Sequence, residues 1–257
     1  MKTLVVLPTY NESATIAEML RRIRASATPR GSGVSPGNQI DVLVVDDNSP
    51  DGTADLAEAL AAELGGIEVL RRPGKAGLGS AYREGFKVGL ARGYEALVEM
   101  DADLSHDPSV LGDLLAELDS GADIVIGTRY MPGGKIPDWP WHRRAISRAG
   151  NVYARFMLDL SARDATSGYR AYHRRALESI NLTAVRADGY GFQVEMAYKI
   201  ERAGGVLAEV PIEFHDRTFG RSKMSSRIVV EALTLVTWWG LSSRLRARRK
   251  RRAPARV

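Results

Sequence analysis

Residues 95–118, EALVEMDADLSHDPSVLGDLLAEL, run from an apolar segment through an acidic turn into an amphipathic segment. The part from 95 to 100 is typical of a buried strand, and 109–118 carries apolar residues at helical spacing. Asp101, Asp103 and Asp107 stand between them with no Lys or Arg among them. Strands disfavour Asp, and neighbouring like charges repel. These carboxylates therefore either cap the next helix or bind a cation from outside.

The same strand–turn–helix unit recurs along the chain. Other predicted strands are 3–7, 41–45, 67–70 and 123–127, and other predicted helices are 13–26, 53–64 and 80–91. Residues 28–38 are rich in Gly, Pro and Ser and predict a loop. This alternation indicates an α/β fold with a single, mostly parallel central sheet flanked by helices. In such sheets ligands bind at the carboxyl ends of the strands.

Composition excludes several classes of protein. The 257 residues are 44% hydrophobic, enough for a sizeable core, and the absence of Cys rules out disulfides and thiolate chemistry. The apolar run at 4–7 is too short for a signal peptide. A dinucleotide-binding G-x-G-x-x-G is not completed, because Tyr82 stands at its third glycine position, and there is no P-loop.

Polar clusters follow three of the predicted strands. Residues 8–12 read PTYNE, and residues 44–53 read VVDDNSPDGT. Asn11 or Ser13 is a candidate cap for the first helix, and Asp51 or Ser49 for the second. Capping needs only one residue, so the remaining acids are free to bind a base edge or ribose hydroxyls. Spacing alone leaves Asp46 and Asp47 as equal candidates for that contact.

The third cluster is the pair Asp101 and Asp103. Hard carboxylate oxygens suit Mg²⁺ or Mn²⁺, which also bind substrate phosphates. Asp107 is better explained as a helix cap, with Pro108 at the first helical position. A single D-x-D is a weak signal, whereas polar clusters after three of the predicted strands are a stronger one.

Together the motifs resemble a known family. They are, in order, PTYNE, VVDDNSPDGT, GLGSAYREG, MDADLSHDP, GTRY, TSGYRAY and RTFGRSK. They look like those of the dolichol-phosphate mannosyltransferases and bacterial polyprenyl-phosphate mannose synthases of glycosyltransferase family 2, over about residues 3–223. The resemblance implies a GT-A type nucleotide-diphospho-sugar transferase fold. It also implies metal-dependent, inverting transfer of mannose from GDP-mannose to a polyprenyl monophosphate, with Mg²⁺ or Mn²⁺ as cofactor.

The resemblance also implies roles for individual residues. Asp101 and Asp103 would hold the metal and the diphosphate, and Ser105, where relatives may have Gln, would reach the metal through water. Arg129 would meet phosphate oxygens and act in catalysis. The residues implied to bind the nucleotide sugar are Pro8, Tyr10, Glu12, Val45, Asp47, Asp101, Ala102, Asp103, Arg129, Arg217 and Lys223.

Two basic segments are suited to phosphate. Residues 217–223 place three cations around a Gly, so this loop is either a lid over the sugar nucleotide or a solvated charged loop. A helix that begins near Arg143 would put Arg143 and Ser147 on one face. With Arg129 they would bind the acceptor phosphate, as in related enzymes. The alternative is a basic helix end docked on the body by Trp139 and Trp141.

No His–Asp pair for a general base stands out in the sequence. A lipid monophosphate is already ionised at neutral pH, so its oxygen needs no base before it attacks a sugar. Glu195 is a reserve candidate for a base, although a helical salt bridge explains it as well. The four histidines are interpreted as surface or packing residues; they are His106, His142, His173 and His215.

The C-terminal end points to a membrane surface. We expect a catalytic domain at 1–227, an apolar, membrane-interfacial helix at 228–242 and a polybasic tail at 243–257. The tail carries eight of the basic residues, which leaves a net charge of −3 on residues 1–242. A stretch of 14 apolar-rich residues at 228–241 is shorter than a membrane span. The alternative is a helix packed on the body with a solubilising tail.

These features predict a peripheral enzyme on the cytoplasmic face of an anionic membrane, with a separate membrane-anchoring protein as a further partner and no nucleic acid. The alternatives are the same chemistry with another donor such as UDP-glucose, a non-catalytic nucleotide-sugar-binding module, or a nucleic-acid binder that acts through the tail.

Overall fold

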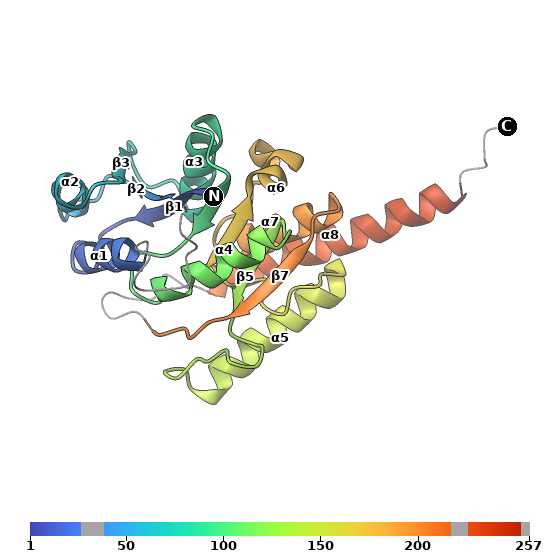
Figure 1. Cartoon of the computed structure of the whole chain (residues 1–257). Helices are drawn as coiled ribbons and strands as arrows, with labels where there is room; N and C mark the ends of the chain where they lie inside the picture. The colour runs from blue at the N-terminus through green and yellow to red at the C-terminus, as the bar shows by residue number, and fades with distance from the viewer. Residues whose placement is uncertain (27–38, 217–225, 253–257) are drawn as a thin grey trace.

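The structure is a computed structural model, and it describes residues 1–26, 39–216 and 226–252. The predicted loop at 28–38, the cations Arg217 and Lys223, and the end of the tail lie outside the described residues. Seven strands form one sheet in the order β3-β2-β1-β4-β6-β5-β7 (Figure 1). The strands are β1 (Lys2–Thr9), β2 (Gln39–Asp46), β3 (Ile67–Arg71), β4 (Ala96–Glu99), β5 (Ile124–Thr128), β6 (Arg170–His173) and β7 (Leu207–Pro211).

Eight α-helices and two short 3-10 helices connect the described strands. The α-helices are α1 (Ile16–Ser26), α2 (Thr53–Leu64), α3 (Leu78–Ala91), α4 (Leu111–Asp119), α5 (Trp141–Leu158), α6 (Arg174–Ser179), α7 (Gly189–Arg202) and α8 (Ser226–Arg252). The 3-10 helices are η1 (Pro108–Val110) and η2 (Leu182–Ala184). The predicted α/β fold is confirmed, and five strands and four helices lie where the sequence places them.

The sheet is mostly parallel, as predicted. β1 pairs in parallel with β2 and β4, β2 with β3, and β5 with β7. β6 is the exception, because it runs antiparallel between β4 and β5. The carboxyl ends of β1, β2 and β4 therefore meet at one edge, which gathers the three predicted polar clusters.

Each face of the sheet has its own core. Along β1, Leu4 and Val6 point into one core with α3 and α7, while Val5 and Leu7 point into the other with α1, α2 and α4. This alternation follows from the period-two geometry of a strand. Both cores are fully buried at these positions, so every strand of this region is covered on both faces.

Local capping agrees with the sequence at η1, whereas the N-cap position of α2 is Gly52, which makes no side-chain cap. Asp107 accepts a hydrogen bond from Ser109 N at 2.9 Å, with Pro108 at the first helical position of η1. At α2, Asp51 rather than Ser49 accepts from Thr53 N, at 3.1 Å. The main departure is α1, which begins at Ile16 instead of residue 13.

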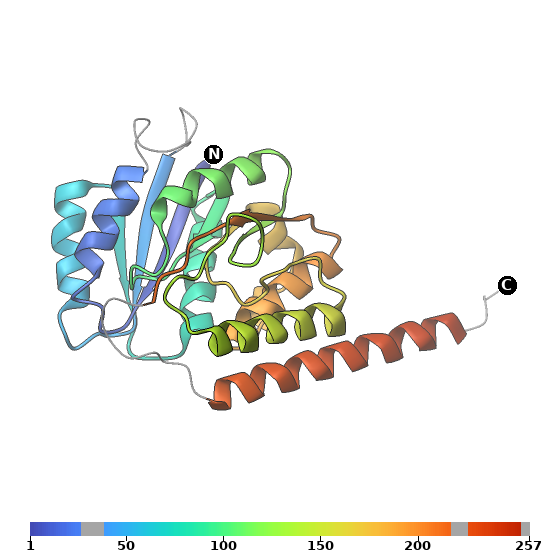
Figure 2. The ribbon, with the colours of Figure 1, turned by 90° about the horizontal axis from the view of Figure 1, so that it is seen from below.

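α8 is a single helix of 27 residues that runs on through most of the predicted tail. One face packs on the body: Val236 is buried, Trp239 stacks on Tyr198, and Thr237 and Tyr153 share a hydrogen bond of 2.6 Å. α8 lies beside α5, and its C-terminal half projects beyond the body (Figure 2). No helix in the part of the chain that the structure describes is long and apolar enough to cross a membrane.

Candidate active site

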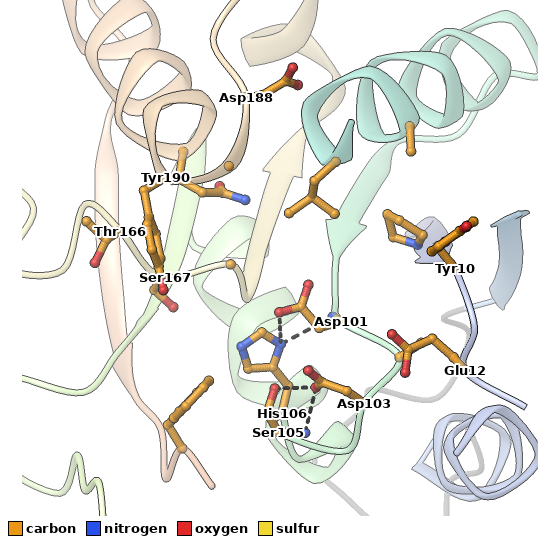
Figure 3. A pocket seen from close by; sticks show the side chains of 18 of the residues that line it. Tyr10, Glu12, Asp101, Asp103, Ser105, His106, Thr166, Ser167, Asp188 and Tyr190 are labelled. Carbon is orange, nitrogen blue, oxygen red and sulfur yellow. Dashed lines mark hydrogen bonds and ion pairs between the residues drawn. The ribbon is translucent and has the colours of Figure 1, made fainter. Parts of the chain in front are cut away.

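The carboxyl ends of β1, β2 and β4 border a cavity of about 580 Å³. Polar side chains from distant segments point into it: Tyr10 and Glu12 lie on one side, Thr166 and Tyr190 on the other, and Asp101 between them (Figure 3). The predicted site residues that line the cavity are Pro8, Tyr10, Glu12, Asp47, Asp101, Ala102, Asp103, Arg129 and Arg143. Of the predicted residues that the structure describes, two do not: Val45 is buried in the core, and Ser147 lies outside the lining.

The structure separates the two candidates at the end of β2. Asp46 is buried and accepts hydrogen bonds from Thr9 Oγ1 at 2.8 Å and from Ser49 Oγ at 2.6 Å, which fixes the turn. Asp47 lines the cavity and pairs with Arg72 at 2.6 Å, a buried contact. Asp47 is therefore the residue placed to meet a ligand, and Asp46 shapes the loop.

The acidic turn after β4 holds its two carboxylates differently. Asp103 is buried, and its Oδ1 accepts from Ser105 N at 3.0 Å and from Ser105 Oγ at 2.5 Å. Asp101 is partly exposed to the cavity, and its Oδ1 accepts from Tyr82 Oη at 3.3 Å. The contact raises the pKa of the Tyr82 phenol further above its usual value, after burial as the main cause.

His106 is a packing residue, one of the two roles that the sequence left open for it. It is buried in the lining of the cavity, with its Nδ1 accepting the backbone N–H of Asp101 at 3.3 Å (Figure 3). The ring stacks on Tyr169 at 5.2 Å between centroids. His106 thus holds the acidic turn in place. The other three histidines do not line the cavity.

Arg129 provides positive charge in the lining of the cavity. Its Nε and Nη2 donate to the two carboxylate oxygens of Asp164, both at 2.7 Å, and both residues are buried. Burial alone would raise the pKa of Asp164, but the ion pair with Arg129 holds it below its usual value. Asp164 thus holds one edge of the guanidinium, formed by Nε and Nη2. The guanidinium also lies 5.3 Å from the ring centre of Phe214.

Arg143 lies in the first turn of α5 and lines the cavity. Its guanidinium lies 3.9 Å from the ring centre of Trp139 and donates to Asp216 at 2.9 Å. Trp139 is 4% exposed and docks on the body, whereas Trp141 is 77% exposed and does not. The structure brings Arg129 and Arg143 to the cavity. It does not bring Ser147, which contacts Tyr130 instead.

The profile of "Glycosyl transferase family 2" matches residues 4–180. An undecaprenyl-phosphate mannosyltransferase from Micrococcus luteus is 50% identical over 96% of this chain and 99% of its own length. A polyprenol monophosphomannose synthase from Mycolicibacterium smegmatis is 47% identical over 95% of this chain and 89% of its own. The chain belongs to glycosyl transferase family 2. The predicted resemblance to its polyprenyl-phosphate mannose synthases is confirmed.

Solved structures agree with this fold. A glucosyl-3-phosphoglycerate synthase from Mycobacterium tuberculosis, solved with Mn²⁺, UDP-glucose and phosphoglyceric acid, superposes with a TM-score of 0.65 at 21% identity, over 93% of this chain and 79% of its own. The mannosyl-3-phosphoglycerate synthase from Rubrobacter xylanophilus gives 0.62 at 21% identity, over 100% and 77%. At these identities the likeness establishes the GT-A type fold.

The carboxylate pair of this family 2 chain fits a hard divalent ion that shares its coordination with a substrate. Asp101 and Asp103 supply oxygen ligands at one edge of the cavity. Among residues 1–26, 39–216 and 226–252, no group of three or more acidic or His side chains could form a complete metal cage. Mg²⁺ and Mn²⁺ commonly bind through one or two carboxylates, with waters and phosphates as the remaining ligands. The donor set therefore suits an ion that arrives with a diphosphate.

Some residues that line the cavity were not identified from the sequence. Lys75 lies 4.4 Å from the ring centre of Tyr10, and its place in a Gly-rich loop after a strand could have indicated it. Asp188 and Gln193 come from the start of α7, which carries no comparable signal. Glu195 lies outside the cavity and forms the salt bridge expected for a helical residue, with Lys199 at 2.8 Å.

Proposed function

We propose that this chain transfers mannose from GDP-mannose to a polyprenyl monophosphate and forms polyprenyl-phosphate mannose. The observation that carries the proposal is one cavity lined both by a carboxylate pair and by two arginines, Arg129 and Arg143. Such a cavity accepts a metal-bound diphosphate and a second phosphate together. The 50% identity to the Micrococcus luteus mannosyltransferase over nearly the whole chain supports this substrate pair.

The chemistry follows from the charge of the acceptor. An oxygen of the ionised lipid phosphate attacks the anomeric carbon of mannose, the bond to the diphosphate breaks, and GDP leaves with that electron pair. Attack from the face opposite the leaving group inverts the anomeric centre. Arg129 and Arg143 would hold the acceptor phosphate in line and reduce its repulsion from the donor. No proton has to be removed, so no side chain acts as a base.

Asp101 and Asp103 would hold Mg²⁺ or Mn²⁺ against the diphosphate. The ion, when bound, stabilises the negative charge that develops on the leaving group. His106 keeps the backbone of Asp101 fixed, and Ser105 orients Asp103. Both carboxylates are thus positioned before a ligand arrives. On the nucleotide side, Tyr10, Glu12 and Asp47 would contact GDP, as the family resemblance implies.

We propose further that α5 and α8 dock on an anionic membrane at its cytoplasmic face. α8 exposes one apolar stripe, formed by Val230, Trp238, Leu241 and Leu245, which are 52% to 61% exposed. α5 lies beside it and exposes Trp141, Val152 and Phe156, which are 61% to 77% exposed. Arg244 lies where the stripes meet and donates to Phe156 O at 3.1 Å. Because α5 begins at the cavity, a lipid phosphate at the surface would lie close to Arg143.

The direct test is transfer of labelled sugar to a short polyprenyl phosphate by the full chain, with Mg²⁺ or Mn²⁺. GDP-mannose and UDP-glucose are compared in parallel, each with and without chelator. The proposal predicts product from GDP-mannose alone and none after chelation. Product from UDP-glucose alone would contradict the proposal that GDP-mannose is the donor. Binding of a sugar nucleotide with no turnover would favour a non-catalytic module or an absent membrane partner, and binding of nucleic acid alone would favour the tail-dependent alternative.

A further inference from the structure

Gln193 is a buried polar side chain on the cavity wall. It lies on α7 and is 2% exposed, yet it lines the cavity. Within ordinary hydrogen-bond geometry neither Nε2 nor Oε1 has a partner among the described residues, and a polar neighbour of the carboxamide is the carboxyl of Glu99, whose pKa it lowers as a hydrogen-bond donor. A carboxamide has two N–H donors and an oxygen acceptor, and an unmet donor or acceptor in the interior costs about 1–3 kcal/mol. Glu99 can occupy only part of this capacity, so the rest is suited to a ligand of the cavity.

The backbone around Gln193 is held rigidly. Arg170 is fully buried and donates from Nη1 to Gln193 O at 2.6 Å. Its other nitrogens donate to Ala165 O at 2.6 Å and to Ser167 O at 2.7 Å, so one guanidinium joins α7 to the loop 165–168. A carboxamide on such a support keeps its place when the cavity fills. The fixed position is what a specificity contact requires.

On the protein side, the carboxyl of Glu99 lies near Gln193. Burial raises the pKa of Glu99 to about 7, and the nearby Arg170, Gln193 and Tyr172 each pull it back toward its usual value. Gln193 therefore acts as a hydrogen-bond donor toward Glu99 through one of its N–H groups, at a geometry outside the ordinary range. Glu99 instead accepts from Tyr172 Oη at 3.0 Å.

The space between Gln193 and Asp101 identifies the ligand. A Cβ placed on Gly168 would lie 3.6 Å from Asp101 Oδ2 and 3.8 Å from Gln193 Nε2, so both groups border the same small volume. If Asp101 binds the metal and diphosphate of the donor, the two groups attached to that diphosphate, the nucleoside and the sugar, must lie on either side of it. Tyr10 and Glu12, which are assigned to the nucleoside, lie on one side of Asp101, and Tyr190, which like Gln193 belongs to α7, lies on the other (Figure 3). The group near Gln193 is therefore the sugar. Its hydroxyls both donate and accept hydrogen bonds, as a carboxamide does.

We propose that the carboxamide of Gln193 hydrogen-bonds a hydroxyl of the donor mannose and is a specificity-determining residue for the sugar. The proposal rests on the proposed donor, GDP-mannose. A site built to pair with a sugar hydroxyl rejects a donor that presents it elsewhere, because the buried amide is then left unpaired. The epimer GDP-glucose is such a donor.

The test uses the full chain with Gln193→Leu, which keeps the size but removes both hydrogen-bonding atoms, and Gln193→Glu, which keeps an acceptor. Calorimetry measures binding of GDP and of GDP-mannose, and transfer assays give kcat/KM for GDP-mannose and GDP-glucose. For Gln193→Leu we expect GDP binding within about twofold of wild type and kcat/KM for GDP-mannose lower by about 10- to 100-fold. The preference for mannose over glucose should fall by a similar factor.

A matched control is Gln39→Leu, the same change at an exposed glutamine of β2, which should alter none of these values. If Gln193→Leu lost binding affinity for GDP and for GDP-mannose by the same factor, the proposal would be overturned, because this result would show a general disturbance of the cavity. Unchanged mannose preference in Gln193→Leu would overturn it as well. Failure of the donor assignment is distinguishable: wild type would then prefer UDP-glucose, and the same comparison is made with UDP and UDP-glucose.

Discussion

At the scale of single residues, Asp101 and Asp107 belong to one acidic turn but serve different purposes. Asp101 lines the cavity beside His106, and Asp107 is exposed and caps η1. The sequence separates the two correctly, because Pro108 marks the cap. The same substitution at the two positions can therefore be compared, with Asp107 as the control for Asp101.

Asp101→Asn should abolish mannose transfer, at least 10³-fold, and leave the thermal midpoint nearly unchanged, because the residue is partly exposed and ligand-facing. Asp107→Asn, the control, should retain turnover, and its stability should change by about 1 kcal/mol at most. Transfer assays with thermal unfolding check both. Full turnover in Asp101→Asn would refute the metal role.

Glu99 makes stability depend on pH. Its folded pKa is about 7, against 4.5 for the ordinary carboxyl, so the folded state binds the proton more tightly than the unfolded state. Stability is therefore lost as pH rises from about 4.5 to 7, by about 3 kcal/mol in total. Glu99→Gln should remove this loss. The free energy of unfolding of the variant, relative to that of wild type, should therefore increase as the pH rises through that range, measured by chemical denaturation without metal. A constant difference between the two proteins would contradict the assignment.

Asp164 stabilises Arg129. Asp164→Asn should leave a buried guanidinium without its counter-charge and lower the free energy of unfolding by about 3 kcal/mol. It should also raise KM for the acceptor, since Arg129 loses its fixed orientation. Glu18→Gln removes an exposed ion pair with Arg22 and serves as control, with an expected effect below about 0.5 kcal/mol. Denaturant titration measures both, and equal effects would show that burial of the first pair is unimportant.

At the scale of elements, two helical glycines differ in what they touch. A Cβ on Gly85 of α3 would come within 2.4 Å of Val6 Cγ1 in β1, whereas one on Gly150 of α5 would meet nothing within 4 Å. Gly85 lets α3 lie close against the sheet. Gly150 has no such neighbour among the described residues.

Gly85→Ala should destabilise the protein by about 1–3 kcal/mol through overpacking. Gly150→Ala should stabilise it by up to about 1 kcal/mol, because alanine is the better helix former. Thermal unfolding decides between these signs. If both substitutions stabilise, the contact between α3 and β1 is looser than the structure indicates.

At the scale of the whole molecule, α5 and α8 form one surface from segments far apart in the chain. The sequence indicates an interfacial helix at 228–242, and its alternative was a helix packed on the body. The structure shows the packing, because Val236 is buried and Trp239 stacks on Tyr198, and it leaves Trp238 and Leu241 exposed on another face. Contact of this exposed face with a membrane stays a prediction. Membrane docking by both helices is a proposal that needs its own measurement.

Phe156→Ser and Trp238→Ser should each weaken binding to anionic vesicles by about 10-fold, because a large apolar side chain no longer enters the lipid interface. Leu56→Ser, an exposed position on α2, is the control and should have no effect. Vesicle sedimentation at low and high salt measures this. Binding that depends on salt but not on Phe156 or Trp238 would leave charge alone as the cause.

The sequence by itself determined the alternation of strands and helices from 3 to 127 and the polar clusters after β1, β2 and β4. It also indicated the family, because these features are local: periodicity, caps and motifs lie within a few residues. The sequence did not indicate that β6 inserts antiparallel between β4 and β5, since strand order depends on contacts between distant segments.

Only the tertiary structure decided which polar residues share the cavity. It places Asp47, but not Asp46, in the lining of the cavity, and it packs His106 there beside Asp101. It also paired Arg129 with Asp164, and it buried Gln193 beside Asp101. The physical reason is common to all four: the environment of each side chain is set by residues from other elements, and their distance in the sequence carries no signal of their distance in space.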